Sequence, residues 1–498
     1  MSLPLRAVVV LLLAALTPGP ASAVPPPSPP GVPDQELVKP DPRAIFGVLD
    51  NGLRYGVMRR TGVHDMTLLL YIKAGSADEA ENERGVAHFL EHMAFDSSRA
   101  FPGNSTFRSF GDVGVSLQPD KSARTDFRST TFELNLSQIT PAKIDLGLRW
   151  LRDAADGLTL AQADVDQERE TIRSEYRASQ NAGGLVQHEV IDFLGRGLLG
   201  PSRDPIGADK TIASIDARTL RSFYQKWYRP ERAVVILVGD APAESLKASV
   251  EAAFGSWKDA APAAPEPELG GVAPRGLDVL VVSDPRATNT VNVCRATDKD
   301  PVEPEDVNTH QREIADVTWS SVLRHRLALL SQSANPPFIS AKVTMEYAFD
   351  RANFACVNVS MRDQNWRDTV RNVAIETRRM ERFGITDTEL SRTKLQYGAA
   401  LDHTVAALPT ASSRGLAQVM LLVMSSARVF DTGEEDRRVG RMAMDRISKA
   451  TIDTRFRHVW TEGAGPLIVI LSSASPTSAE VKAAWTDTAG TPLSTPVD

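Results

Sequence analysis

The order of apolar and polar residues along the chain predicts an α/β fold. Residues 66–73 (MTLLLYIK) form a β-rich and mostly apolar run, which is typical of a buried strand. Residues 50–52 (Asp-Asn-Gly) precede it and predict a tight hairpin turn. From Gly85 to Ala94 the apolar residues recur with a helical period, so a helix follows the strand.

Two stretches far apart in the chain resemble each other. Residues 212–242 contain Ile-Ala-Ser-Ile-Asp, then a Phe and a Trp, and the strand Val-Val-Ile-Leu. Residues 447–476 repeat this order with the strand Ile-Val-Ile-Leu, and both stretches continue into a helix-like segment that ends at Trp257 or Trp485. An internal duplication explains the likeness economically and predicts two homologous α/β halves. The alternative is a chance similarity of two helix–strand–helix units.

Composition and charge narrow the classes of function. The chain has 498 residues, of which 42% are hydrophobic, and this fraction excludes wholesale disorder. Lys plus Arg number 56 against 63 Asp plus Glu, for a net charge of -7, which argues against a nucleic-acid partner. Cys294 and Cys356 are too few for a disulfide framework or a Cys-rich zinc site. A single disulfide and two buried free thiols both fit the alternating segments around them.

The first residues are typical of an export signal. Arg6 is followed by the apolar run 7–16, and Ala21-Ser22-Ala23 supplies the small-x-small pattern of a cleavage site. The run is shorter than the roughly 20 apolar residues of a membrane span. We therefore expect an exported protein with no stable membrane span; an uncleaved anchor is the alternative. The predicted domain boundaries are a signal peptide at 1–23, a Pro-rich tether at 24–43, a catalytic domain at 44–258, a linker at 259–274, a second domain at 275–487 and a tail at 488–498.

Residues 88–92 read His-Phe-Leu-Glu-His, the H-x-x-E-H arrangement. On a helix, positions i, i+3 and i+4 share a face, so His88, Glu91 and His92 converge while the two residues between them turn toward the core. Two neutral imidazoles suit Zn²⁺, and a carboxylate one turn away can deprotonate a water that the metal holds. The order is the inverted form of the H-E-x-x-H zinc peptidase motif. A helix with two surface histidines and a solvated Glu is the alternative.

A catalytic zinc needs a third protein ligand and an open position. In the acidic segment 166–175, which is expected to be helical, Glu168 and Glu175 are seven residues apart and share one face, whereas Glu170 points elsewhere. Only one of the pair need reach the metal. The other could hold a ligand histidine through a hydrogen bond.

These motifs resemble those of the M16 metallopeptidases, the group of pitrilysin, insulin-degrading enzyme and mitochondrial processing peptidase. The stretch 75–95, which contains H-x-x-E-H, looks like the zinc-motif region of that family. Residues 168–175 are similar to its second motif, and residues 223–230 (FYQKWYRP) with 238–240 (Val-Gly-Asp) are similar to its signature at the end of each half.

The resemblance covers most of residues 44–258 and, more loosely, residues 275–485. It implies an α/β (α+β) fold of two homologous halves, each a mixed, largely antiparallel sheet packed with helices, with no zinc motif in the second half. It also implies a zinc endopeptidase that cleaves peptides or small unfolded proteins. The residues that it assigns are the zinc ligands His88, His92 and Glu175, the general base Glu91 and the supporting Glu168.

In the mechanism that the resemblance implies, zinc lowers the pKa of a bound water and polarises the scissile carbonyl. Glu91 takes the proton of the water and passes it to the leaving amine. A peptide could add as a strand to the edge around residues 125–136 (TDFRSTTFELNL), although the same pattern suits an ordinary sheet strand.

Three features depart from the family pattern. The family often has Asn-Ala-x-Thr on the edge strand that pairs with substrate, whereas residues 121–125 read Lys-Ser-Ala-Arg-Thr, with Ser122 in the place of the Asn. His310-Gln-Arg-Glu in the second half lacks the closing His, so we expect no metal there. The Arg and Tyr with which the family grips substrate from a distant C-terminal domain are not identifiable in this chain.

The partners follow from the same resemblance. Family members that enclose a peptide chamber use more halves than this chain has, so we expect a homodimer or a heterodimer with a second M16-like subunit. The export signal at residues 1–23 leads us to expect the bacterial periplasm as the location. A non-catalytic assembly or chaperone-like subunit of the same fold is the rival interpretation, against which the intact Glu91 argues. A different zinc hydrolase with a helical H-x-x-E-H is disfavoured by the duplication and by the pair Glu168 and Glu175.

Overall fold

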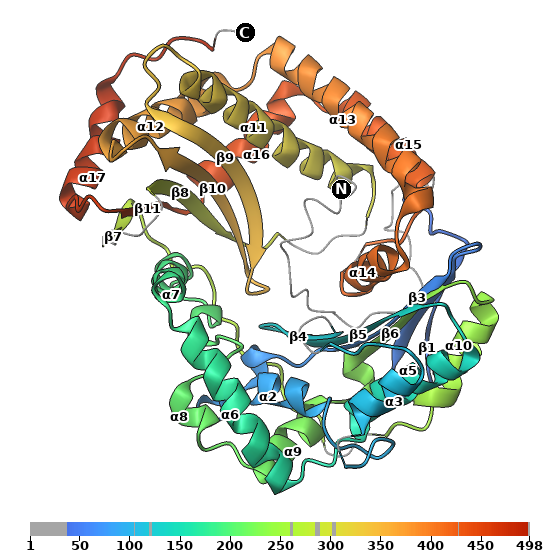
Figure 1. Cartoon of the computed structure of the whole chain (residues 1–498). Coiled ribbons are helices and arrows are strands. Elements are labelled where there is room, and N and C mark those ends of the chain that lie inside the picture. Colours follow the sequence, from blue (N-terminus) through green and yellow to red (C-terminus); the bar gives the residue numbers. More distant parts are fainter. Residues whose placement is uncertain are drawn as a thin grey trace.

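The computed structural model describes residues 37–103, 105–118, 122–258, 262–283, 289–300, 305–426 and 428–496. The predicted signal peptide and residues 24–36 of the predicted tether lie outside this set. The described chain forms two α/β halves that face each other (Figure 1). None of the helices in the described part of the chain combines the length and the apolar character that a membrane span requires.

The first half is a six-stranded sheet with helices. Its strands are β1 (Ala44–Val48), β2 (Arg54–Arg59), β3 (Asp65–Ile72), β4 (Ala123–Thr125), β5 (Thr130–Ser137) and β6 (Ala233–Gly239). Its helices are α2 (Val86–Met93), α3 (Thr106–Asp112), α5 (Pro141–Asp156), α6 (Gln162–Ser179), α7 (Ala182–Leu194), α8 (Asp209–Ile212), α9 (Ala217–Trp227) and α10 (Ala243–Phe254).

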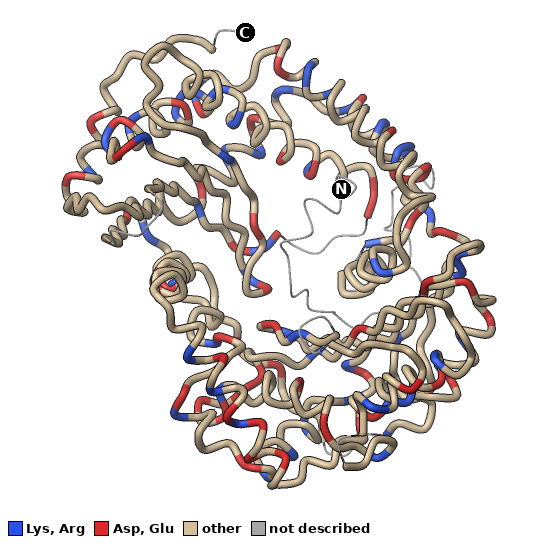
Figure 2. The backbone as a smooth tube through the Cα atoms, in the orientation of Figure 1, with Lys and Arg blue, Asp and Glu red and all other residues tan. Residues whose placement is uncertain are grey.

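The second half has a five-stranded sheet. Its strands are β7 (Asp278–Ser283), β8 (Thr290–Asp298), β9 (Phe338–Ala348), β10 (Ala352–Met361) and β11 (Ala464–Ser472). Its helices are α11 (Val307–Ser331), α12 (Trp366–Phe383), α13 (Asp387–Ala407), α14 (Ser413–Met424), α15 (Gly433–Arg446), α16 (Lys449–Thr461) and α17 (Ser478–Thr486). Acidic and basic positions are interspersed along both halves (Figure 2).

The two sheets share one topology, which confirms the prediction of two homologous halves. The strand order β2-β6-β3-β5-β4 in the first sheet matches β7-β11-β8-β10-β9 in the second. In each sheet only the first of these pairs is parallel, and the remaining pairs are antiparallel. The repeated segments in the sequence are the corresponding elements α9, β6 and α10 in one half and α16, β11 and α17 in the other.

The first sheet is apolar on both faces because a helix from the second half covers its far side. Alternate residues of β3 face opposite ways: Leu68 and Leu70 join the core of their own half, whereas Leu69 packs with residues of α14 such as Met420. Helix α14 lies against this sheet in Figure 1. The apolar run at 66–73 is therefore the consequence of burial from both sides.

The second sheet is covered in the reciprocal way. Phe193 of α7 and Leu198, which follows that helix, pack against Cys294, Phe354 and Leu467 on β8, β10 and β11. One helix of each half, α7 or α14, thus packs on the sheet of the other half. This reciprocal packing fixes how the halves sit relative to each other.

Two connecting segments add further ties. Residues 37–43, which belong to the predicted tether, are packed on the second half: Val38 is buried there, and the Asp41 N–H donates to the Phe430 carbonyl (2.7 Å). In the predicted linker, Glu266 forms ion pairs with Lys73 (3.1 Å), Arg128 (2.8 Å) and Arg232 (2.5 Å).

The edge of the first sheet differs from the prediction over residues 125–136. Strand β5 is paired with β3 along its length and with β4 over Thr130–Phe132. The edge strand is therefore β4, which is three residues long. The assignment of residues 130–132 to the edge was wrong because the short strand before the hairpin turn folds back over them.

Cys294 and Cys356 are directly opposite each other on β8 and β10 and form a disulfide. Their side chains are buried beneath α7, with Cα atoms 4.1 Å apart. Of the two possibilities that the sequence leaves open, the structure selects the disulfide.

We predict that replacing both cysteines by Ala lowers the stability of the protein. The bond closes a loop of 62 residues in the unfolded chain, and the loss of that constraint costs about 2–4 kcal/mol. Thermal unfolding of the double variant and of the oxidised wild type, each with and without reductant, measures the effect. Equal melting temperatures for the two proteins would contradict the prediction.

Candidate metal centre

The H-x-x-E-H segment forms helix α2, as the periodicity predicts. Phe89 and Leu90 are fully buried in the core of the first half. The side chains of His88 and His92 are each 15% exposed, and their rings are 4.7 Å apart. The helix therefore anchors one face in the core and presents both imidazoles on the other.

A buried carboxylate organises the beginning of α2. The two oxygens of Glu79 accept hydrogen bonds from the N–H groups of Gly85 (3.0 Å) and Ala87 (2.9 Å). Burial raises the pKa of Glu79 to about 8, although these two hydrogen bonds oppose the shift. Gly85 has a φ of 98°, a conformation that residues with a Cβ rarely adopt. The chain can therefore turn sharply into the helix.

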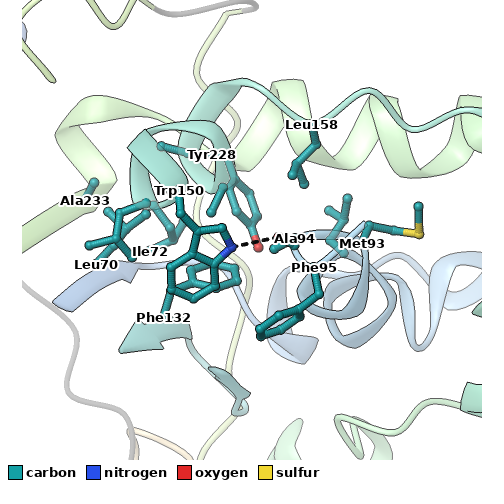
Figure 3. Packing of buried hydrophobic residues seen from close by; sticks show 14 of the residues in the cluster. Leu70, Ile72, Met93, Ala94, Phe95, Phe132, Trp150, Leu158, Tyr228 and Ala233 are labelled. Atoms are coloured by element: carbon teal, nitrogen blue, oxygen red, sulfur yellow. Dashed lines mark hydrogen bonds between the residues drawn. The ribbon is translucent and has the colours of Figure 1, made fainter. Parts of the chain in front are cut away.

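The end of α2 is held by Trp150 of α5. The indole N–H of Trp150 donates to the carbonyl of Ala94, the residue after the helix, at 2.9 Å (Figure 3). Phe95 and Phe132 pack around this indole. Because both of its ends are bonded to buried groups, α2 has a defined position relative to the sheet.

Glu175 of α6 meets the two histidines of α2. Its Oε2 lies 3.8 Å from Nε2 of His88 and 3.5 Å from Nε2 of His92. Each of the three residues offers a ligand atom within 4.8 Å of the others. Ligands about 2.1 Å from a tetrahedral Zn²⁺ are roughly 3.4 Å apart, so the observed spacing fits that ion.

Glu168 holds His92 from the side away from Glu175. Its Oε1 lies 2.7 Å from Nδ1 of His92. A carboxylate only accepts, so Nδ1 carries the hydrogen and Nε2 faces Glu175. Burial opposes a charge on His92, but the hydrogen bonds to Glu168 and Glu175 outweigh it and raise the pKa of His92 to about 10.

The charges around the three residues favour a cation. Burial and the neighbouring His92 lower the pKa of His88 to about 4, so His88 is neutral at pH 7. The hydrogen bond from His92 is the main reason that the pKa of Glu175 is lowered. Two carboxylates, Glu168 and Glu175, thus lie against the two imidazoles, and their negative charge favours a cation between the ligand atoms.

Glu91 lies beside this group and is oriented by the edge strand. The hydroxyl of Thr125 on β4 donates to Oε2 of Glu91 at 2.6 Å. Glu91 is 8% exposed, and burial raises its pKa while the Thr125 hydrogen bond lowers it. A carboxylate with a raised pKa is a stronger proton acceptor than an ordinary Glu.

Sequence reasoning did not assign roles to three residues of this region. Glu79 and Thr125 stood in the quoted motifs, but only the fold shows what their oxygens contact. Asp96, just beyond α2, was also missed; burial and the nearby Glu168 and Asp164 raise its pKa to about 7. The signal that could have found Glu79 is its position ahead of a helix N-terminus, where carboxylates are favoured.

In the second half, His310 lies on α11 away from these residues. It is buried, and its Nδ1 is 3.0 Å from the carbonyl of Asp306. Among the described residues, His88, His92 and Glu175 form the one group whose spacing suits a metal ion.

Comparisons with known protein families match both halves. Residues 57–195 match the family described as Insulinase (Peptidase family M16). Residues 214–397 match the family described as Peptidase M16 inactive domain. The first match contains the whole of α2 and α6.

Curated relatives share part of their length with this chain. The probable zinc protease PqqL of Escherichia coli is 29% identical over 364 residues, which are 71% of this chain and 38% of the relative. The probable zinc protease PqqL of Haemophilus influenzae is 34% identical over 201 residues, which are 40% of this chain and 22% of the relative. The chain therefore spans well under half the length of these relatives.

A solved structure shows the same fold. The first half of the periplasmic protease PqqL from Escherichia coli matches with a TM-score of 0.85 and 22% identity, over 93% of this chain and 100% of that one.

We predict that Glu168→Ala weakens zinc binding by roughly 10–100-fold, because His92 loses the partner that fixes its ring. The zinc affinity of Glu168→Gln, whose side chain still accepts a hydrogen bond, should lie between that of Glu168→Ala and that of the wild type. The measurement is competition for zinc with a chelating dye. Glu170→Ala on the same helix is the control, since the Glu170 side chain is 68% exposed; equal losses in both variants would contradict the assignment.

Proposed function

The chain belongs to peptidase family M16, and from this premise we propose that it is a zinc-dependent endopeptidase acting on peptides or small unfolded proteins. The observation that carries the proposal is the meeting of His88, His92 and Glu175 from two helices, with Glu91 beside them. The zinc-protease relatives support the metal and the class of reaction.

In this proposal His88, His92 and Glu175 hold Zn²⁺. When bound, the ion supplies Lewis-acid chemistry: it makes a water ligand more acidic and polarises a carbonyl. Glu168 keeps Nε2 of His92 turned toward the ion by accepting the hydrogen of Nδ1.

Glu91 moves the proton. Its carboxylate accepts a proton from the attacking water and then donates it to the nitrogen of the leaving amine. The Thr125 hydroxyl donates to Oε2 of Glu91 at 2.6 Å, and in this proposal Oε1 takes the proton. The burial of the carboxylate keeps its affinity for protons above that of an exposed Glu.

The edge strand β4 is the proposed site for substrate backbone. It adjoins Glu91 through Thr125, and the far side of a three-residue edge strand can accept an extended peptide. Ser122, in place of the family's Asn, precedes this strand and is buried.

The rival function is a non-catalytic assembly or chaperone-like subunit of the same fold. The retained Glu91, its hydrogen bond to Thr125 and the spacing of the three proposed ligands favour catalysis. A subunit without activity would have no need of this combination.

We predict that Glu91→Gln lowers kcat by about 10²–10⁴-fold, the usual contribution of a positioned acid–base group. Zinc content should not change, because Glu91 is not a proposed ligand. Cleavage of a quenched fluorescent peptide and metal analysis of the same samples measure both effects. Chelation should abolish the activity of the wild type, and zinc should restore it; a Glu91→Gln variant with wild-type activity would sink the proposed role.

We propose further that the protein is exported, to the bacterial periplasm. The pattern of residues 1–23, the disulfide between Cys294 and Cys356, and the description of one related structure as a periplasmic protease support this location.

We predict that the active form contains a second unit, either another copy or a sibling M16-like subunit. The longer relatives, in which this chain matches only part of the length, support the idea. Light scattering combined with peptide cleavage tests it. A fully active monomer would contradict it.

A further inference from the structure

The turn between β9 and β10 in the second half has an unusual backbone. Its two central residues, Phe349 and Asp350, have φ values of 55° and 58°. The Arg351 N–H donates to the Ala348 carbonyl across the turn at 3.2 Å. Gly, Asn and Asp normally fill such left-handed positions, so Phe349 is the exception in this turn. A bulky aromatic residue in this unfavourable conformation suggests that its side chain has a specific role.

The Phe349 ring contacts the first half. It packs edge-on against Phe127, with ring centroids 5.6 Å apart. It also lies against Gly200, where a Cβ would fall 1.8 Å from the ring. In Figure 1 the β9–β10 hairpin reaches down toward β4.

Asp350 adds a charge to the same contact. Its buried carboxylate accepts from the Tyr347 hydroxyl (2.6 Å), pairs with Lys299 (3.2 Å) and lies 3.7 Å from Nε of Arg128. The Arg128 side chain is 1% exposed and also pairs with Glu266 at 2.8 Å. A buried guanidinium depends on such partners because it has been removed from water.

Phe127 and Arg128 belong to the turn 126–129, which joins β4 to β5. The first half holds this turn through its backbone: the N–H groups of Ser76 and Ala77 donate to the carbonyls of Asp126 (3.2 Å) and Phe127 (2.8 Å). The turn therefore contacts the second half through the side chains of Phe127 and Arg128, and it is hydrogen-bonded to the first half through its backbone.

This turn helps to determine where β4 lies. Strand β4 has three residues, β5 is its partner among the described strands, and its last residue is Thr125, the hydrogen-bond donor to Glu91. A displacement of the turn therefore moves both Thr125 and the edge available to substrate.

We propose that the Phe349–Asp350 tip is a positioning element for the reaction: it holds the 126–129 turn so that Thr125 orients Glu91 and β4 is presented to the substrate. The inference rests on the proposed peptidase function. It assigns to the second half, which lacks a metal motif, a direct part in the geometry of the active site.

The test uses Phe349→Gly in the full chain. Glycine relieves the left-handed backbone, so the hairpin turn itself is not weakened, while the ring contact is deleted. We expect kcat/KM for a peptide to fall by roughly 10–100-fold, because small displacements of catalytic groups have effects of this size. Zinc affinity should stay within about twofold of the wild type, since the proposed ligands lie on α2 and α6. Phe349→Leu, which keeps apolar bulk, should recover part of the loss.

Hydrogen exchange supplies a readout that does not depend on activity. In Phe349→Gly, amides of residues 122–130 should exchange faster than in the wild type, whereas those of α2 and α6 should not change. Leu395→Ala, at a 76% exposed position of the second half, is the control and should resemble the wild type in every measurement.

The outcomes separate the two proposals. Unchanged exchange at residues 122–130 in Phe349→Gly would overturn the positioning role. So would a fall in zinc affinity of the same fold as the fall in kcat/KM, accompanied by a lower melting temperature. A wild-type protein that binds zinc but cleaves no peptide would overturn the proposed function, and the exchange measurement would still decide whether the tip holds β4.

Discussion

The burial of both faces of each sheet is the constraint on which the rest of the structure depends. In each half, one face of the sheet packs against a helix that comes from the other half. Helix α14 of the second half covers the first sheet, and α7 of the first half covers the second sheet. Separating the halves would expose two apolar surfaces at once. This exposure is unfavourable because apolar burial stabilises by about 25 cal/mol per Å². The halves therefore have one arrangement relative to each other.

The candidate active site uses this arrangement. Helix α6, which carries Glu168 and Glu175, is followed directly by α7, and α7 is anchored on the second sheet. Arg275, the first residue after the predicted linker, donates to the Leu194 carbonyl at the end of α7 (2.8 Å) and to that of Phe193. The position of α6 is thus supported by both halves.

The charged side chains at the candidate site and between the halves are buried or partly buried and contact groups from other elements. His92 lies between two carboxylates, Glu91 accepts a hydrogen bond from a single hydroxyl, and Arg128 is enclosed by acidic groups from the linker and from the second half. In each case one group depends on partners from another element, since a buried charge without a partner is costly. These ion pairs and hydrogen bonds therefore specify the geometry more than they add stability.

The sequence alone predicted the features that depend on local periodicity. The helical spacing of His88, Glu91 and His92 determines that they share a face, and the shared face of Glu168 and Glu175 follows from a spacing of seven. The duplicated order of strands and helices predicted two halves of one topology. Such features follow from the geometry of single elements, which is the same in every fold.

Contacts between elements that are distant along the chain were decided by the tertiary structure. The pairing of Cys294 with Cys356 depends on strand register, and the edge strand was misplaced because residues 130–132 are covered by a strand that lies before the turn. The contact of Phe349 with Phe127 joins residues of different halves. The sequence therefore determined which side chains each helix or strand presents, whereas the packing of the two halves decided which of them meet, because burial energy depends on the whole assembled surface and not on any one segment.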